Sequence, residues 1–234
     1  MNDPFGQAIK EYFERGKAPQ IHVNSNYTEG ESIAPSYFFR NEKELPKIEK
    51  QALKYCKGKI LDIGAAAGCH SLILQKKGFN VTALEKSKLA AEVMNNRGIV
   101  KVINADIYEY HETQYNTLLL LMNGAGIGGT INGLKTLLNQ LKHLLLEGGK
   151  ILLDSSDIKY LFEEEDGSHW VDMANNNYYG EMQYEVSFRK AKSKFDWLFV
   201  DYNTLQLMAS EIGFSCTMLE KGEHHDYLAQ LKLM

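Results

Sequence analysis

Residues 60–68 read Ile60-Leu61-Asp62-Ile63-Gly64-Ala65-Ala66-Ala67-Gly68, an apolar run with one carboxylate followed by five small residues. This pattern predicts a buried strand that turns directly into a helix. Small residues at such a turn let a nucleotide-like ligand pack against the backbone. A dinucleotide fingerprint would need glycine at positions 66 and 69, where this chain has Ala66 and Cys69, so a different ligand is expected. A small-residue turn without any ligand is the alternative.

From residue 59 onward, strand-like apolar runs alternate with helix-length amphipathic segments, as they do in chains of βαβ units. Strands are expected at residues 59–63, 80–84, 100–104, 116–122 and 150–154, and helices that end at glycine at 69–77, 86–97 and 131–146. An antiparallel hairpin is expected next, over 178–190 and 195–200 with its link at 192–194, then a helix over 203–212 and closing strands at 214–220 and 227–233. The sequence predicts an α/β fold with a doubly wound, mostly parallel, seven-stranded sheet and helices on both faces.

The chain of 234 residues is long enough for one main domain with a modest attachment. Its start differs from the rest, because a possible helix over residues 3–15 is followed by a polar and aromatic stretch with Pro19, Pro35 and Pro46 and no clean periodicity. We therefore expect an N-terminal cap or lid at residues 1–50 and a main domain at residues 51–234. Within the main domain, residues 156–200 are expected to form an insertion on the substrate side that carries the hairpin.

Two further carboxylates follow the next two predicted strands. Glu85 ends the second strand, 23 residues after Asp62, where an acid can accept hydrogen bonds from both hydroxyls of a ribose. Asp106 follows the third strand in the run Asn104-Ala105-Asp106-Ile107. Because the carboxyl ends of parallel strands meet at one edge of a sheet, the three acids are expected to line one ligand crevice. An ordinary surface position is the alternative for Glu85.

The pattern acid-x-Gly-x-Ala-x-Gly, with acids after the next two strands, resembles class I (Rossmann-like) S-adenosylmethionine-dependent methyltransferases. The resemblance is close over about residues 59–158. From there to residue 234 it rests on the order of the predicted strands and on the closing antiparallel strand. The family usually has glycine where Ala66 stands, and the extra methyl group should be tolerated if this position needs no positive φ. The resemblance implies a methyltransferase with S-adenosylmethionine as cofactor, S-adenosylhomocysteine as product, no metal and an antiparallel last strand.

The resemblance also implies which residues hold the cofactor. The turn would wrap the methionine part, Glu85 would take the ribose, and Asp106 would accept from the adenine amino group with Ile107 against the ring. Arg40 in the cap would pair with the cofactor carboxylate, and His70 opens the first helix beside the turn; a surface position is the alternative for both. The expected cofactor-binding residues are Arg40, Asp62, Gly64, Ala65, Ala66, Gly68, His70, Glu85, Lys86, Asp106, Ile107 and Asn123.

The glycine-rich loop at residues 121–129 follows the fourth strand, where the resemblance places the methyl acceptor. Asn123 could orient the acceptor there, and a plain turn residue is the alternative. The loop lacks the Asn/Asp-Pro-Pro-aromatic motif that such enzymes often use on amide or exocyclic amino nitrogens. Residues 154–156 either line the same crevice or form a turn and a helix cap. Aromatic residues, which suit a cationic or flat acceptor or an ordinary core, gather at Tyr27, Tyr37, Phe38, Phe39, Trp170, Tyr178, Tyr179, Tyr184 and Trp197.

A formal net charge of -4 and a pI of about 6.0 argue against nucleic acid as a partner. No apolar run is long enough to span a bilayer and no signal peptide is visible, so a cytoplasmic protein without membrane contact is expected. His224-His225-Asp226 cannot converge on a metal from one strand, and the acidic run 163–166 should be a solvated lid face. We expect a small-molecule acceptor and a monomer or homodimer. The alternatives are a nicotinamide-dependent oxidoreductase and a cofactor binder without catalysis.

Overall fold

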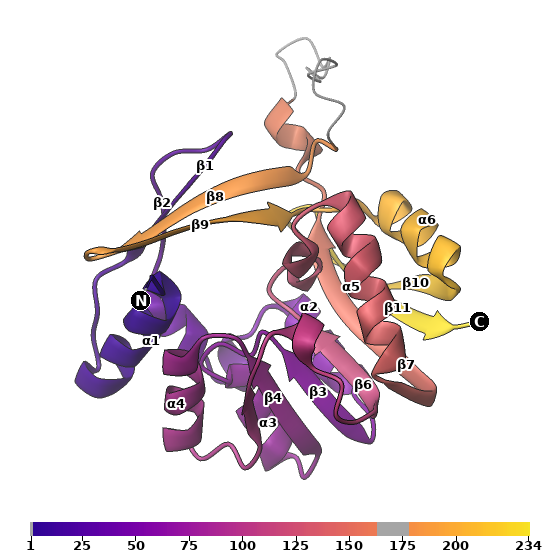
Figure 1. Ribbon diagram of the computed structural model, residues 1–234, viewed down its shortest axis with the longest axis horizontal. Helices are drawn as coiled ribbons and strands as arrows, with labels where there is room; N and C mark the ends of the chain where they lie inside the picture. Colours follow the sequence, from indigo (N-terminus) through magenta and orange to yellow (C-terminus); the bar gives the residue numbers. More distant parts are fainter. Residues whose placement is uncertain (1, 163–177) are drawn as a thin grey trace.

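The computed structural model describes residues 2–162 and 178–234, in which a central sheet lies between helices and below a second, smaller sheet (Figure 1). The central sheet contains β3 (Lys59–Ile63), β4 (Asn80–Glu85), β5 (Val102–Asn104), β6 (Tyr115–Leu120), β7 (Leu145–Ser156), β10 (Phe214–Lys221) and β11 (Asp226–Leu233). Its order is β10-β11-β7-β6-β3-β4-β5. The strands from β5 to β7 are parallel, whereas β11 runs antiparallel to both of its neighbours. The predicted doubly wound, seven-stranded sheet with an antiparallel last strand is confirmed.

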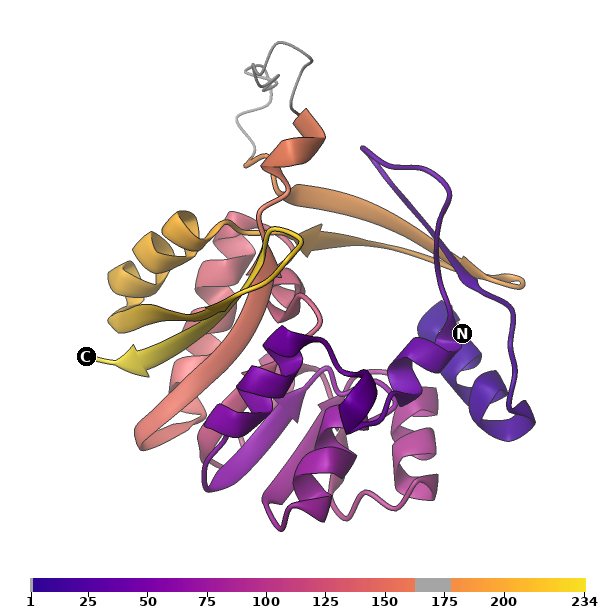
Figure 2. The same ribbon diagram turned by 180° about the vertical axis from the view of Figure 1, so that it is seen from behind.

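Alternate residues of the parallel strands enter two separate apolar layers, because successive side chains of a strand point to opposite faces. Leu118 and Leu120 of β6 pack on the face that is covered by α5 (Ile131–His143) and α6 (Tyr202–Ile212). Leu119 packs on the opposite face with α2 (Lys47–Tyr55) and α3 (Cys69–Lys76), which lie in front of the sheet in Figure 2. Helices therefore cover both faces, as predicted.

Two predicted boundaries are wrong. The helix expected over 131–146 ends at His143, because the carbonyl of Leu144 accepts a hydrogen bond from the Tyr115 N–H at 2.8 Å and draws the chain into the sheet. Gly148, at which this helix was expected to end, instead lies within β7 and has φ +69°. The hairpin link also lies elsewhere, since residues 192–194 belong to β9 and the turn falls at Arg189, with φ +53°, and Lys190.

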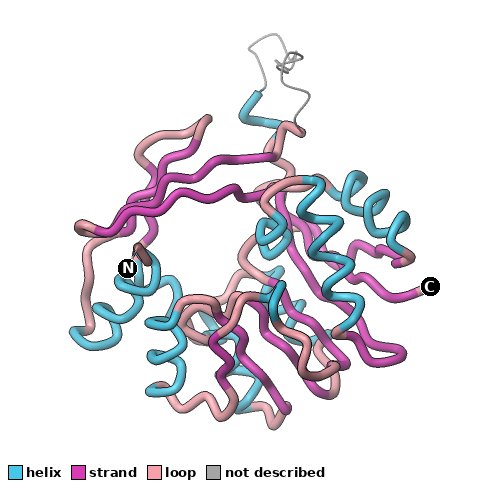
Figure 3. Tube along the Cα trace, in the orientation of Figure 1, coloured by secondary structure: helices cyan, strands magenta, loops and turns pink. Residues whose placement is uncertain are grey.

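The cap and the insertion form one antiparallel sheet, which we call the lid sheet. It contains β1 (Ile21–Ser25), β2 (Glu31–Ile33), β8 (Glu181–Phe188) and β9 (Ala191–Leu198), in the order β2-β1-β8-β9. Its central pairing joins His22 to Ser187, from opposite ends of the chain. Figure 3 shows the lid sheet passing over the edge of the central sheet where the loops after its parallel strands lie.

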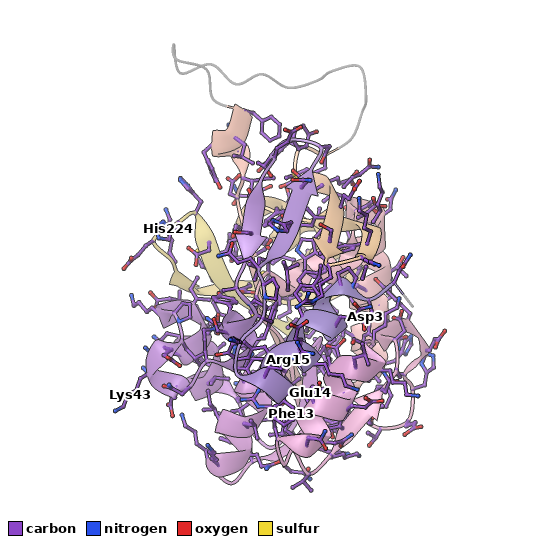
Figure 4. The ribbon with its side chains drawn as sticks, turned by 90° about the vertical axis from the view of Figure 1, so that its left-hand side faces the viewer. Asp3, Phe13, Glu14, Arg15, Lys43 and His224 are labelled. Atoms are coloured by element: carbon purple, nitrogen blue, oxygen red, sulfur yellow. The ribbon has the colours of Figure 1, made fainter. Side chains whose placement is uncertain are left out.

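The lid sheet is apolar on the side that faces the rest of the molecule. Val23, Val186 and Phe188 are buried there against Ala8 and Ile9 of α1 (Pro4–Arg15). Neighbouring positions that point outward, such as those at 22, 24, 183 and 192, are exposed. Figure 4 views the molecule from the left-hand side of Figure 1, with Phe13, Glu14 and Arg15 labelled at the end of α1.

The described residues also bear on the proposed division of the chain. Residue 50 lies inside α2, whose Ile48 and Ala52 pack against the central sheet. The assignment of residues 1–50 to a separate cap stays a prediction. Among residues 2–162 and 178–234, no helix has both the length and the apolar character that crossing a membrane requires.

Candidate functional site

The turn between β3 and α3 presents bare backbone at the centre of the sheet edge. Gly64 is exposed with φ +70°, and a Cβ added there would meet only the Cδ1 atom of Ile127, at 3.6 Å. The N–H groups of Gly64 and Ala65 donate to the carbonyl of Leu84 at 2.9 and 3.2 Å, which ties the turn to the next strand. The side chain of Ala65 is buried beneath the turn. A ligand could therefore approach the main chain at Gly64.

Ala66 and Gly68 differ from what the sequence indicated. Ala66 has φ +50°, so the condition on which its methyl group was expected to be harmless is not met. Its left-handed backbone is held by a hydrogen bond from the Ala66 N–H to Oε2 of Glu85 at 2.8 Å. Gly68 is buried, and any Cβ there would collide with the Ile99 side chain. Gly68 is thus required for packing against the segment after α4 (Lys88–Asn96).

Substituting Ala66 with glycine is expected to raise the free energy of unfolding slightly. A left-handed alanine costs about 1 to 2 kcal/mol, and the added freedom of an unfolded glycine takes back about 0.5 to 1 kcal/mol. The expected gain therefore lies between about 0 and 1.5 kcal/mol, measured by urea denaturation. A clear loss of stability would mean that the methyl group of Ala66 contributes packing that outweighs its backbone strain.

The three acids have different surroundings. Glu85 accepts hydrogen bonds from the N–H groups of Ala66 and Ser87, both at 2.8 Å, and burial raises its pKa. Each of its oxygens keeps a lone pair that a hydroxyl could use. Asp62 is fully buried and accepts from the Ser71 hydroxyl at 2.6 Å, so it fixes the start of α3. Burial also raises the pKa of Asp62.

The corner beyond β5 is more open. Asp106 accepts from the Tyr108 N–H at 3.1 Å and forms an ion pair with Lys86 at 2.7 Å. Although partial burial opposes it, the bond to Lys86 lowers the pKa of Asp106. The Ile107 side chain is buried in the main core, so its contact with a ring stays a prediction. The exposed apolar side chain here is Tyr108, which donates from its hydroxyl to the Ile127 carbonyl at 3.3 Å.

A buried charge cluster lies on the other side of the turn. Both oxygens of Glu49 on α2 accept from Nη2 of Arg40 at 3.0 Å, and His70 Nε2 lies 2.6 Å from Glu49 Oε2. The side chains of Arg40, Glu49 and His70 are 9%, 4% and 5% exposed, respectively. The Arg40 guanidinium also lies over the ring of Tyr37, 3.7 Å from its centroid. One guanidinium nitrogen, Nη1 of Arg40, is buried without a hydrogen-bond partner.

The opposite charges in this cluster stabilise the ionised forms of Glu49 and His70. Burial opposes the ionised form of Glu49, yet His70 and Arg40 outweigh it and lower the pKa of Glu49. Burial likewise opposes the charge on His70, but neighbouring Cys69, Glu49 and Asp62 raise the pKa of His70 well above 6.5. Sequence reasoning missed Glu49. The available signal was a glutamate on the apolar face of a short helix, between Ile48 and Ala52.

The loop after β6 is held by the end of β7. Asp154 accepts from the N–H groups of Met122 and Gly124 at 3.1 and 2.9 Å, and burial raises its pKa to about 7. Asn123 donates to the Leu198 carbonyl at 3.0 Å and accepts from the Ser155 hydroxyl at 3.1 Å. Residues 154–156 belong to β7, so the expected turn with a helix cap is wrong. With both ends of its amide bonded, Asn123 fixes the loop to the lid sheet; its role toward an acceptor stays a prediction.

The aromatic residues of the insertion take two kinds of position. Trp197 lies so close to Gly126 that any Cβ at this glycine would collide with the indole. Tyr178 and Tyr179 donate from their hydroxyls to Asp201 and Asp157 at 2.7 and 2.8 Å and are structural. Trp170 and the acidic run 163–166 lie outside the described residues. Within residues 2–162 and 178–234, no cluster of three or more His, Cys, Asp or Glu side chains could hold a metal ion.

Known proteins show similarity to this chain in sequence and in structure. The sequence matches no model of a known protein family. A 23S rRNA (uracil(747)-C(5))-methyltransferase of Pyrococcus horikoshii is 39% identical over 75 residues, which are 31% of this chain and only 18% of that protein. The CcbJ methyltransferase of Streptomyces caelestis, at 13% identity and a TM-score of 0.62 over 83% of this chain and 99% of its own, shows a shared fold.

One solved structure matches nearly the whole chain. It is a S-adenosylmethionine-dependent methyltransferase of Bacteroides fragilis in complex with S-adenosylhomocysteine, 38% identical, with a TM-score of 0.93. The match covers 99% of this chain and 95% of that one, so it includes the lid sheet as well as the central sheet. The alternative of a nicotinamide-dependent oxidoreductase is thereby set aside. The chain belongs to the S-adenosylmethionine-dependent methyltransferases, and S-adenosylmethionine is its cofactor.

Proposed function

We propose that the enzyme methylates a small molecule enclosed between the turn at residues 64–68 and the lid sheet. The observation that carries this proposal is one buried apolar cluster against which side chains of both regions pack. Ala66 of the turn and Met122 of the loop after β6 pack in one apolar cluster with Tyr184 and Phe195 from the inner face of the lid sheet. The lid sheet would cover an acceptor at this place, which would exclude water from the reacting groups and favour a small molecule over a folded macromolecule.

The residues of the turn and its surroundings fit the cofactor. When bound, S-adenosylmethionine supplies a methyl group on an activated sulfonium. Glu85 would accept from the ribose hydroxyls and Asp106 from the adenine amino group, while the exposed backbone of Gly64 lies against the methionine part. Arg40 Nη1, buried without a partner, would be satisfied by the cofactor carboxylate. Because the cofactor itself is activated, these residues have to bind, orient and exclude water, and a dedicated base is optional.

Replacing Glu85 with alanine is expected to weaken binding of S-adenosylhomocysteine by about 1 to 3 kcal/mol, because hydrogen bonds to a charged acceptor are lost. Calorimetric titration measures this directly. Glu109→Ala is the matched control, since Glu109 is an exposed glutamate near the same corner of the sheet. If Glu85→Ala bound S-adenosylhomocysteine as tightly as the control, the role of Glu85 would be limited to holding the turn in place through its hydrogen bond from the Ala66 N–H.

The acceptor class is tested with a cofactor that carries a deuterated methyl group. The enzyme is incubated with ultrafiltered small metabolites and, separately, with RNA and with protein from the same cells, and the labelled products are identified by mass spectrometry. We expect label in the metabolite fraction. The relative from Pyrococcus horikoshii is named for a base of 23S rRNA, so RNA is the informative competitor. Label in RNA or protein alone would overturn the proposal.

A further inference from the structure

The loop after β6 holds two consecutive residues in the left-handed backbone conformation, which asparagine tolerates but which strains a methionine. Met122 has φ +66° and Asn123 φ +60°, although neither is glycine. Of the other described non-glycine residues with positive φ, Arg189 and His225 lie at exposed hairpin turns, and Ala66 lies in the cofactor turn. Strain of this kind persists only where the surroundings impose it, and it concentrates at functional sites.

The surroundings of the loop do impose this conformation. The buried carboxylate of Asp154 accepts the N–H groups on either side of Asn123, from Met122 at 3.1 Å and from Gly124 at 2.9 Å. The Asn123 amide is bonded to β9 and β7 through Leu198 and Ser155. The loop is therefore fixed to the lid sheet and to the central sheet at once.

The strain changes the direction in which Met122 points. Along β6 and beyond, Leu118 and Leu120 enter the layer under α5, while Leu119 and Leu121 enter the opposite layer. Regular alternation would send Met122 to the first layer. Instead its half-buried side chain packs against the apolar cluster beneath the lid sheet, against which Ala66, Tyr184 and Phe195 also pack. The left-handed turn thus places a flexible thioether in the same apolar cluster as Ala66 of the cofactor turn and the aromatic residues of the lid sheet.

We propose that Met122 is a specificity-determining residue of the acceptor site and that Asp154 is the residue that positions it. The proposal rests on the function proposed above. An apolar or aromatic part of the acceptor lies against Met122 and the lid aromatics, and the length of the thioether limits its size. Methionine suits such a wall because it is unbranched and makes favourable contacts with aromatic rings.

Labelled-methyl profiling of the metabolite fraction tests this assignment. Met122→Ala is expected to methylate additional, bulkier metabolites and to lose at least about 10-fold in kcat/KM for the main wild-type acceptor. Its affinity for S-adenosylhomocysteine should stay within about 2-fold of wild type. Met208→Ala is the control, because Met208 is half-buried on α6 and packs against the other layer, so it removes the same atoms away from the site.

Asp154→Asn tests the positioning role. Its side-chain NH2 group would face one of the two backbone N–H groups that now donate to Asp154, so that one of the two hydrogen bonds holding the loop is lost. Its product profile should broaden like that of Met122→Ala, a change that lost stability alone would not cause. A Met122→Ala profile identical to wild type would overturn the inference and leave the proposed function intact. Label only in RNA or protein with the wild-type enzyme would overturn both.

Discussion

Replacing Glu49 with alanine is expected to lower the free energy of unfolding by about 3 to 5 kcal/mol, the usual range for breaking a buried ion pair. The substitution leaves Arg40, whose side chain is 9% exposed, without the carboxylate that accepts from its Nη2, and it removes the partner of His70. Urea denaturation measures the loss. Glu49→Gln is the matched variant, because it keeps the shape and one acceptor oxygen and should fall between alanine and wild type. A loss below about 1 kcal/mol would show that Arg40 escapes to solvent when unpaired.

The same cluster predicts how stability depends on pH. The lowered pKa of Glu49 stabilises the fold above the ordinary value of 4.5, and this contribution is lost as the pH falls through the lowered pKa. The raised pKa of His70 stabilises the fold below 6.5, and this contribution is lost as the pH rises through the raised pKa. The difference in free energy of unfolding between wild type and Glu49→Gln should therefore be largest between about pH 4.5 and 6.5 and should become smaller at lower and at higher pH. A difference that is flat with pH would contradict the charged pair.

Replacing Gly64 with alanine is expected to weaken binding of S-adenosylhomocysteine by more than about 100-fold, nearly 3 kcal/mol. The added methyl group would point into the open space beside the turn, where only Ile127 lies within 4 Å. Because Gly64 has φ +70°, the substitution also costs about 1 to 2 kcal/mol of stability. Valine would add a β-branch to this strain, so alanine is the cleaner test.

Gly78→Ala is the matched control for this experiment. Gly78 has φ +87° and nothing within 4 Å of an added Cβ, so it carries the same backbone strain at the far end of α3. Both variants should lose similar stability by urea denaturation, and only Gly64→Ala should lose binding by calorimetry. If Gly64→Ala and Gly78→Ala both bound S-adenosylhomocysteine nearly as tightly as wild type, glycine at position 64 would be needed only for the backbone conformation of the turn and not for close approach of the cofactor.

The parallel sheet was predictable from sequence because its signals are local. Each strand is a short apolar run, each helix has an apolar stripe, Glu85 is the last residue of β4, and Asp106 lies two residues beyond β5. The lid sheet was not predictable, because the pairing of β1 with β8 depends on a contact between distant segments that carry no mark of one another. Its strands could be suspected only as an irregular cap and a hairpin.

The site shows the same division. The small-residue turn was visible in the sequence, but the positive φ of Ala66 was not, since it follows from the bond to Glu85. The sequence did not show that Glu49 of α2 holds the Arg40 side chain, and the role of Arg40 toward the cofactor stays a prediction. Asp154 was ambiguous for a related reason, because its partners Met122 and Gly124 lie on a different strand's loop.

The pairing of His22 with Ser187 has a consequence for the order in which the protein can be made. A ribosome adds about 5 to 20 residues per second, so β1 emerges on the order of 10 s or more before its partner strand exists. During that interval Ile21 and Val23, fully and nearly fully buried in the finished protein, can pair with β2 but lack Val186 and Phe188 of β8 in their apolar cluster. Non-local pairing of this kind is also slow once both strands are present. Strands β3 to β7 are therefore synthesised before β1 can pair with β8, whereas β10 and β11 follow later, so the lid sheet gains its full set of strands before the central sheet does.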